Sequence, residues 1–405
     1  MINLAQAQQK LVESSECRLE SEMLALSNAL GRTASADVVS KLAVPPSDNS
    51  AMDGFALRAA DLDAIDKLAI SQRLAISQRI VAGIEPEQLQ PGTAARIFTG
   101  GVMPLGADTV VIQENCEYDD LEVTVLNTIT AGSNVRPQGQ DIQPGATVIR
   151  KGQRLNAIDL SLLASIGETA VPSYRPLRVA IFSTGDELVE PGIPLKAGQI
   201  YNSNRILLMG LCQQFGLEVV DCGIVEDTLT ATKDALAHAS HKADLILSSG
   251  GVSVGEEDHV KPAVEALGSL AMWKVQMKPG KPVAFGQVRD TPFLGLPGNP
   301  VSSYVVFQLL AVPLISALQG QSYPNPTHFS VRSGFNKAVT SREEYIRVKL
   351  ERNEQGDLYA QRFPNLSSGV MSSLSWADGL VRQNIDQVIQ LDQNVDFFPL
   401  KEGVL

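Results

Sequence analysis

Apolar runs alternate with amphipathic segments between residues 177 and 318. Short runs such as Leu177–Phe182 are typical of buried strands, and the longer segments between them have helical spacing. The pattern predicts strands at 177–182, 217–220 and 244–247 and helices at 203–215, 228–239, 259–267 and 299–318. This alternation predicts a doubly wound α/β domain with a parallel sheet, whose ligand crevice lies beyond the carboxyl ends of the strands.

Two N-terminal segments have a weaker helical pattern. Residues 3–31 carry leucines and methionines near helical spacing, which predicts two short amphipathic helices that end at Gly31. Residues 142–172 contain a strand-like run, Thr147–Ile149, and a helix-like run at 157–166.

Two other regions are mostly β in character. Residues 44–141 contain short apolar runs separated by Pro-Gly, Gly-Gly and Asp-Asp turns, and residues 323–405 include an alternating run after Pro324. They predict a mostly β module and a small C-terminal β domain. The hexapeptide LAISQR occurs at 68–73 and again at 74–79, which we interpret as a local duplication that lengthens a loop or a strand edge.

Composition narrows the possible functions. A chain of 405 residues predicts two to four domains at ~100–200 residues each. The net charge of −12 and the aromatic content of 5% disfavour binding to nucleic acid or anionic lipid. No basic and apolar leader and no apolar run of about 20 residues is present, so we expect a cytoplasmic protein outside membranes. Any anionic ligand must then be held by local groups.

A glycine-rich turn, Gly250–Gly255, follows the strand at 244–247. It matches neither GxGxxG nor GxxxxGK[ST], but its backbone N–H groups and the next helix start could hold a phosphate. A simple tight turn fits equally well. Asp258 either caps that helix or holds a divalent cation bound to phosphate, and the same alternatives apply to Asp227 after the preceding strand.

Other loops at the same edge carry charge. Glu187 follows the first strand and is expected to face the crevice. Lys278 and Lys281 lie on a Pro-Gly turn, where two stiffly held ammonium groups suit an oxyanion, although solvated lysines on an exposed turn give the same pattern. Residues 295–300 begin the last helix, either as an anion site or as an ordinary helix start with proline in the first turn.

Polar loops also occur within the β module. Segments 47–56, 98–104 and 136–141 carry Asp53, Thr99, Arg136 and Asp141. Other chemistries find little support, because the histidines lack a third ligand at zinc spacing, the four cysteines form no Cys-x-x-Cys pair, and no hydrolase triad pattern is present.

Seven segments together resemble the molybdopterin molybdenumtransferase family, the MoeA type, to which the gephyrin E domain is related. In chain order they read PPSDNSAMDGFAL, IFTGGVMPLGAD, VRPQGQDI, FSTGDEL, SSGGVSVGEEDHVKP, MKPGKPVAFG and LPGNPVSS. The resemblance covers about residues 3–385. It implies an elongated homodimer with four domains, divided as 1–43 with 142–172, 44–141, 173–322 and 323–405.

The resemblance also implies a reaction and its residues. Members insert molybdenum from molybdate into adenylylated molybdopterin and release AMP with the help of Mg²⁺. Catalytic positions are Asp53, Thr99, Asp141, Glu187, Lys278 and Lys281. Substrate-binding positions are Gly250, Gly251, Ser253, Gly255, Pro282, Asn299, Pro300, Ser302, Arg347 and Ser368, with Ser367, Ser372 or Ser373 as alternatives to Ser368. Metal-binding positions are Asp227 and Asp258.

The resemblance also implies interaction partners, and two competing functions make different demands on the sequence. Asp53, Thr99 and Asp141 would reach into the crevice of the second subunit, and a molybdopterin adenylyltransferase and apo molybdoenzymes or their chaperones are possible partners. An adenylyltransferase would need only the α/β domain, and a non-catalytic scaffold would tolerate loss of Asp53, Lys278 and Lys281.

The sequence departs from the family in having Phe55 where tyrosine is usual. The resemblance also leaves Glu256 and Glu257 without a role.

Overall fold

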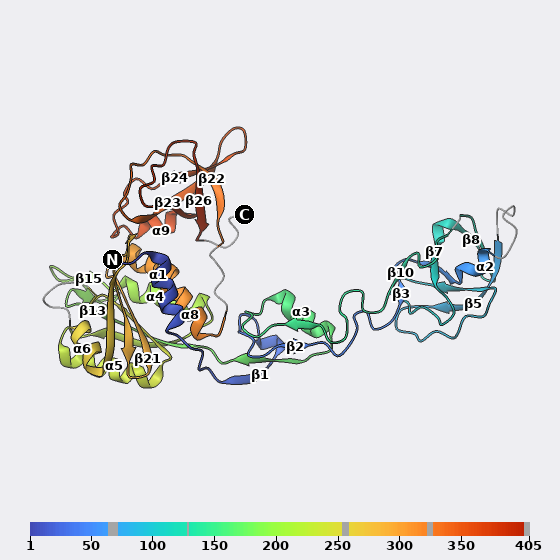
Figure 1. Ribbon diagram of the computed structural model, residues 1–405, viewed down its shortest axis with the longest axis horizontal. Helices are drawn as coiled ribbons and strands as arrows, with labels where there is room; N and C mark the ends of the chain where they lie inside the picture. The colour runs from blue at the N-terminus through green and yellow to red at the C-terminus, as the bar shows by residue number, and fades with distance from the viewer. Residues whose placement is uncertain (64–71, 128, 253–258, 322–326, 401–405) are drawn as a thin grey trace.

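The computed structural model describes residues 1–63, 72–127, 129–252, 259–321 and 327–400. Figure 1 shows an elongated molecule. An α/β body (residues 176–321) and a C-terminal β barrel (residues 327–400) lie at one end, and a β module (residues 44–141) lies at the other. A narrow arm (residues 15–43 and 142–175) connects them. The expected α/β plus β multidomain class is confirmed.

The α/β body is built on one sheet. Its strands are β13 (Arg178–Thr184), β16 (Glu218–Val225), β17 (Leu245–Ser249), β18 (Gly268–Lys274), β20 (Pro282–Val288) and β21 (Thr291–Leu296). Their order is β16-β13-β17-β21-β20-β18, and the first four run parallel. The expected doubly wound sheet is confirmed, but β20 and β18 form an antiparallel edge that the hydrophobic pattern did not predict. A short parallel pair, β14 (Leu188–Val189) and β15 (Ile200–Tyr201), lies outside this sheet.

Helices cover both faces of the sheet. They are α4 (Ser203–Gln214), α5 (Leu229–Lys242), α6 (Val260–Leu267), α7 (Pro300–Val306), the π-helical segment η3 (Phe307–Ala311) and α8 (Val312–Leu318). Side chains alternate along β13, so Val179 and Ile181 pack in the core with α4, α7 and α8. Ala180 and Phe182 pack in the other core with α5 and α6. This two-sided burial explains why the strands read as continuous apolar runs.

The segment Pro300–Leu318 is a single long apolar helix with a π-helical turn in its middle. Its 19 residues are enough to cross a membrane by length and composition, but 78% of the tested window is buried inside the structure. Helix α1 (Leu4–Glu13) packs beside it in the same core, and Gln8 Nε2 donates to the carbonyl of Leu309 at 2.8 Å. The helix is thus a buried core helix on one face of the sheet.

The arm consists of short antiparallel pairs and one helix. The elements are β1 (Ser21–Ala25) with β12 (Ala170–Tyr174), β2 (Val38–Val39) with β11 (Thr147–Ile149), the 3₁₀ turn η1 (Leu26–Asn28) and α3 (Ala157–Ser165). The second N-terminal helix expected before Gly31 is wrong. Met23 and Leu30 are 66% and 64% exposed, so no apolar helical face is buried there, and pairing with β12 satisfies the backbone instead.

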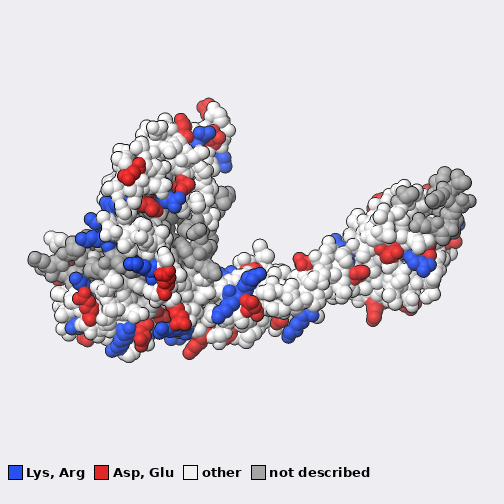
Figure 2. All heavy atoms as spheres, in the orientation of Figure 1, with Lys and Arg blue, Asp and Glu red and all other residues white. Residues whose placement is uncertain are grey.

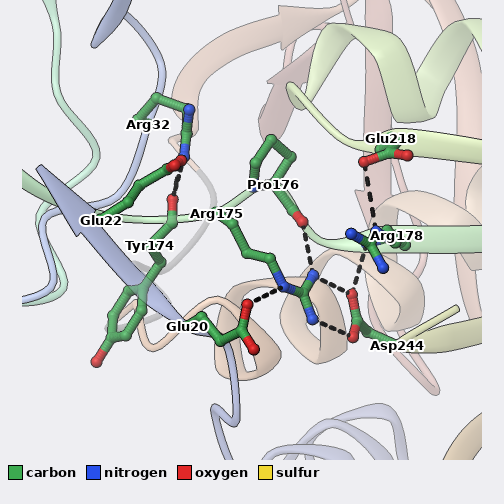
Figure 3. Close-up of polar contacts among 9 residues, drawn as sticks. All are labelled: Glu20, Glu22, Arg32, Tyr174, Arg175, Pro176, Arg178, Glu218 and Asp244. Carbon is green, nitrogen blue, oxygen red and sulfur yellow. Dashed lines mark hydrogen bonds and ion pairs between the residues drawn. The ribbon is translucent and has the colours of Figure 1, made fainter. Parts of the chain in front are cut away.

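A polar cluster fixes the arm to the α/β body (Figure 3). Arg175 donates to both carboxylate oxygens of Asp244 at 2.7 Å, and Asp244 also accepts the N–H of Arg178 at 2.8 Å. Nearby, Arg32 donates to the carbonyl of Tyr174 and pairs with Glu22 at 2.6 Å. Because a bidentate guanidinium–carboxylate pair is directional, this cluster restrains the angle at which the arm leaves the body.

The β module contains a six-stranded sheet in the order β7-β4-β6-β5-β9-β8. Its elements are β3 (Asn49–Ser50), β4 (Gly54–Leu57), α2 (Ala59–Asp63), β5 (Gln72–Ile80), β6 (Thr93–Ile97), β7 (Thr109–Ile112), the 3₁₀ turn η2 (Gln113–Asn115), β8 (Cys116–Tyr118), β9 (Glu122–Val125) and β10 (Val135–Arg136). The second copy of LAISQR lies within β5, an inner strand between β6 and β9, rather than in a loop or at an edge. The first copy lies mostly outside the described residues.

The C-terminal region closes into a barrel. Its strands are β22 (Phe329–Ser333), β23 (Glu343–Arg352), β24 (Leu358–Arg362), β25 (Gly379–Gln383) and β26 (Asn394–Pro399). They pair in the order β23-β24-β22-β26-β25, and β25 also pairs with β23, which closes the ring. Helix α9 (Ser372–Trp376) lies between β24 and β25 in the chain. Strand β19 (Met277–Lys278) belongs by sequence to the α/β body but pairs with β23. The two domains therefore share a continuous backbone contact.

Candidate functional site

Three loops meet at the carboxyl ends of β13, β17 and β21. The strands are in register there, with Ser183 beside Ser249 and Ser249 beside Leu296. The chain passes from β13 to β16 on one side and returns to β17 on the other, so this is a topological switch point, where open α/β sheets bind ligands. Glu187 is exposed in the loop after β13, and its orientation toward the crevice stays a prediction.

The turn after β17 needs glycine for two reasons. Gly250 and Gly251 have φ of +91° and +67°, in the left-handed region. A Cβ on Gly251 would lie 2.2 Å from Cγ2 of Val260, so even alanine would collide with α6. The rest of the predicted phosphate turn, including Ser253, Gly255 and Asp258, lies outside the described residues, as do Glu256 and Glu257.

Two buried asparagines that the sequence analysis missed join these loops. Asn204 Nδ2 donates to Ser249 Oγ at 2.9 Å and to the carbonyl of Gly298 at 2.7 Å. Asn202 accepts from Ser183 Oγ at 3.2 Å. The two residues are only 8% and 2% exposed, and Asn204 Oδ1 and Asn202 Nδ2 have no hydrogen-bond partner within the described part of the chain. Asn202 is also the N-cap of α4, a position where asparagine is common because its side chain accepts a hydrogen bond from the first turn of the helix.

The predicted metal ligands are only partly described. Asp227 follows β16 at the same end of the sheet, and the N-cap of α5 is Thr228, so the alternative in which Asp227 caps this helix is wrong. The N-cap of α6 is His259. No group of three or more His, Cys, Asp or Glu side chains that could hold a metal occurs among the residues that the structure describes. Mg²⁺ commonly needs only one or two carboxylates when substrate phosphates supply other oxygens, so Asp227 fits such an ion.

The lysine turn lies between the α/β body and the barrel. Lys278 is directly opposite Glu344 on β23, and its Nζ is 3.3 Å from Glu344 Oε1. Gly280 has φ of +107°, and a Cβ there would lie 2.4 Å from Cγ2 of Val306 on α7. The turn is therefore packed against the long helix, whereas the side chain of Lys281 is exposed. Pro282 begins β20.

A buried cation lies on the barrel side of this turn. Arg347 is 1% exposed, and its Nη2 donates to the carbonyls of Asn365 and Ser367, both at 3.2 Å. Its Nε has no hydrogen-bond partner among the described residues. Burial lowers the pKa of Arg347, and the carboxylate of Glu344 opposes that shift. A guanidinium held by carbonyl groups rather than by a bidentate carboxylate retains capacity for an anion.

The first turn of α7 connects this cation to the predicted serines. The N–H of Val301 donates to the carbonyl of Ser368 at 3.0 Å, and the adjacent Ser302 is 5% exposed. Asn299 and Pro300 start the helix beside them. The alternative Ser373 is buried, and its hydroxyl donates to the carbonyl of Val370 at 2.5 Å. Ser368 is thus at the start of α7, whereas Ser373 is engaged within its own turn.

Asp53 and Thr99 form a second group, in the β module. Asp53 Oδ1 accepts from the backbone N–H of Thr99 at 2.8 Å and from its hydroxyl at 2.9 Å. These hydrogen bonds lower the pKa of Asp53. Asp53 and Asp141 are exposed, and Arg136 lies on β10. Figure 1 places this module at the opposite end of the molecule from the α/β body, so a single chain does not bring these residues to the strand ends.

Neither the surface charge on the face in view nor the position of a cavity marks the candidate site. Figure 2 shows acidic and basic side chains interspersed over the face in view, so this face offers an anion no broad basic surface. A cavity of about 700 Å³ lies among the barrel, α8 and residues 150–154 of the arm. None of the predicted site residues that the structure describes lines it. The candidate site is therefore defined by its chemistry at the strand ends and the lysine turn.

Three sequence families together match most of the chain. Residues 2–167 match the MoeA N-terminal region (domain I and II), residues 180–317 match a probable molybdopterin binding domain, and residues 336–399 match the MoeA C-terminal region (domain IV). These matches cover the arm and β module, the α/β body and the barrel in turn.

Individual relatives agree with these matches. The molybdopterin molybdenumtransferase of Haemophilus influenzae is 40% identical over 365 residues, which is 89% of this chain and 89% of that protein. The protein of the same name from a Nostoc species is 40% identical over 80% of this chain and 75% of its own length. A solved structure of the molybdopterin biosynthesis MoeA protein from Pyrococcus horikosii covers 99% of both chains with a TM-score of 0.81 and 31% identity. This chain therefore belongs to the molybdopterin molybdenumtransferase family.

Proposed function

We propose that this protein inserts molybdenum from molybdate into adenylylated molybdopterin, releases AMP and so forms molybdenum cofactor. Membership of the family supports molybdenum transfer to molybdopterin as the activity. The observation that carries the proposal is the contact of the Arg347 and Ser368 segments with the start of α7, against which the turn after Lys278 also packs, beside the glycine turn. Such a group suits an oxyanion placed next to a bound phosphate.

Electrostatics explain why the site needs this composition. Molybdate is a dianion and the adenylylated pterin carries a pyrophosphate, so the two substrates repel each other. The protein itself has a net charge of −12. Cations held at fixed positions, such as Lys278 and Arg347, would offset that repulsion, and Lys281 would add a mobile charge. Phosphoryl-group chemistry of this kind depends mainly on positioning and on stabilisation of charge.

Two further groups would act on the phosphate side. Backbone N–H groups of Gly250 and Gly251 would hold phosphate oxygens, and Glu187 would lie on the rim of the same crevice. Asp227, together with Asp258, would hold Mg²⁺, which supplies neutralisation of the leaving phosphate when it is bound. Asn299 and Pro300 would orient the start of α7 toward the substrate.

The residues of the β module require a second chain. Asp53 and Thr99 are preorganised by their own hydrogen bonds but are remote from the strand ends of the same chain. We therefore propose a homodimer in which Asp53, Thr99 and Asp141 complete the crevice of the other subunit. A twofold dimer makes two such composite sites by symmetry.

The cellular setting follows from the same proposal. A cytoplasmic enzyme would receive its substrate from a molybdopterin adenylyltransferase and pass its product to apo molybdoenzymes or their chaperones. The adenylylated pterin and the finished cofactor are both reaction intermediates, so transient contacts with these proteins are expected. Nucleic acid and membrane have no part in the proposed reaction.

The direct test is a reconstituted reaction. Purified protein, adenylylated molybdopterin, molybdate and Mg²⁺ should release AMP, and the product should activate an apo molybdoenzyme. Reactions without molybdate measure background hydrolysis of the pterin nucleotide. AMP release that does not depend on molybdate, or no release at all, would contradict the proposed function.

A further inference from the structure

Glu344 is a buried carboxylate that none of the predicted roles includes. It is 3% exposed, and it lies between two lysines. Its Oε1 is 3.3 Å from Lys278 Nζ and its Oε2 is 3.1 Å from Lys337 Nζ. A buried carboxylate is costly unless it is paired, and here two ammonium groups share it. Its position is thus explained by the lysines on either side.

The backbone fixes this arrangement. Strands β19 and β23 pair in parallel with Lys278 opposite Glu344, so the lysine turn and the carboxylate are held by the same ladder. Glu343, the other acid on this part of β23, accepts the hydroxyl of Tyr345 at 2.6 Å. Arg342 donates to the carbonyl of Met277 at 3.2 Å and so also holds the turn. Glu344 is therefore the carboxylate that directly contacts Lys278 among the described residues.

The two lysines differ in their access to ligand. The side chain of Lys337 is 15% exposed, whereas that of Lys278 is 43% exposed. Lys337 is consequently a nearly buried countercharge for Glu344, and Lys278 can face both the carboxylate and an anion from solvent. Arg347, three residues along β23, is the nearby buried cation whose pKa also depends on Glu344.

We propose that Glu344 is a positioning residue that sets the affinity of the oxyanion site by sharing the ammonium of Lys278 with molybdate. This inference rests on the proposed function. The carboxylate holds the ammonium in place before the dianion arrives and then repels that dianion, while Lys337 offsets part of the repulsion. A site that must release molybdenum to the pterin gains nothing from very tight binding of free molybdate.

Two substitutions test this inference because they should act in opposite directions. Glu344→Gln removes the negative charge and keeps the shape, so the molybdate KM should fall about fivefold to tenfold. Lys337→Met removes the countercharge and keeps the length, so the molybdate KM should rise by a similar factor, about fivefold to tenfold. Both constants are measured from initial rates of AMP release at saturating adenylylated molybdopterin. Sulfate inhibition should become stronger in the first variant and weaker in the second.

A charge-balanced variant separates this effect from general damage. The double variant Glu344→Gln with Lys337→Met should return the molybdate KM close to the wild-type value. Lys349→Met, an exposed position on the same strand, is the matched control and should leave KM unchanged. Thermal unfolding of each variant reports loss of stability independently of KM.

The outcomes distinguish this inference from the proposed function. A wild-type protein without molybdate-dependent AMP release contradicts the function itself. If the wild type is active but the molybdate KM stays unchanged in both Glu344→Gln and Lys337→Met, or changes in the same direction in both, only the role of Glu344 is overturned. If Glu344→Gln does not fold, Lys337→Met decides alone, and an unchanged or lower molybdate KM in that variant overturns the inference.

Discussion

The strand-end crevice and the β module hold their functional residues in different ways. Near the crevice, Asn204 joins loops that are far apart in sequence, and the buried Arg347 holds the segment whose Ser368 contacts the start of α7. In the module, Asp53 is exposed and is held by the hydrogen bonds from Thr99. One group depends on long-range packing, and the other depends on two neighbouring loops.

This difference indicates how the two groups would work together. The strand ends of one chain carry the glycine turn and the acidic residues Glu187 and Asp227, and Lys278 and Arg347 supply positive charge between the α/β body and the barrel. The module presents a carboxylate whose pKa is lowered by its hydrogen bonds, so it stays ionised and is ready to face a second surface. A functional site divided in this way should tolerate separation of its halves onto different subunits.

The largest expected effect comes from inactivating one half of the proposed site in one variant and the other half in a second variant. Lys281→Ala and Asp53→Ala should each lower kcat/KM by about 10²–10³-fold, because each removes a charged group from the proposed reacting centre. Mixed dimers, formed by dissociating and reassembling equal amounts of the two variants, should recover about a quarter of wild-type activity, since about half of the dimers then hold one intact site. Molybdate-dependent AMP release measures the recovery.

Two controls make that experiment decisive. Lys274→Ala changes another exposed lysine, on β18, and should retain full activity. Mixing the two inactive variants without dissociation should give no recovery. If the reassembled mixture also stays inactive while heterodimers are present, the two groups do not share a site across subunits.

Gly251→Ala should strongly impair the crevice and leave the module intact. The new Cβ would collide with Val260 and would also strain a φ of +67°, so kcat/KM should fall about 10–100-fold through misplacement of the phosphate turn. Gly192→Ala is the matched control, because Gly192 has φ of +97° but no atom within 4 Å of an added Cβ. Equal activity losses in the two variants would show that strain, rather than the collision, accounts for the effect.

Asn204→Ala should have a somewhat smaller effect. The variant loses the hydrogen bonds to Ser249 and Gly298, so the loops after β17 and β21 keep only the backbone link from Gly250 to Leu296. We expect kcat/KM to fall about tenfold and the protein to lose about 1–3 kcal/mol of stability. Steady-state kinetics and urea unfolding measure the two effects. Asn28→Ala, an exposed position in the arm, should change neither.

The smallest effect on activity is expected at the junction in Figure 3. Asp244→Asn weakens the pair with Arg175 and should lower stability by about 1–3 kcal/mol. Burial raises the pKa of Asp244, but hydrogen bonds from Arg175 and the N–H of Arg178 lower it, and the net shift is downward. The wild-type advantage over the variant should thus persist above the ordinary carboxyl range and disappear as pH falls through the lowered pKa. Urea unfolding at several pH values checks this, and a pH-independent difference would contradict it.

Local patterns were sufficient for much of the fold. The runs near 177–182 and 244–247 became β13 and β17 because strands covered by helices on both faces need apolar side chains at every position. The helix expected at 299–318 is present for the same reason, although its π-helical middle was not foreseen. The helix expected around 23–30 failed because its apolar residues are exposed and pairing with β12 determines the backbone there.

The sequence by itself determined the chemical inventory: the glycine turn, the lysine turn, the Asp53 and Thr99 loops, and the family to which their order points. Those features are local, because turn geometry and short motifs depend on neighbouring residues. Only the tertiary structure decided that β19 joins the barrel, that Glu344 lies between Lys278 and Lys337, and that the β module lies far from its own crevice. The pairing of β19 with β23, which brings Lys278 to Glu344, joins segments tens of residues apart, and it depends on packing and strand register that no local pattern specifies.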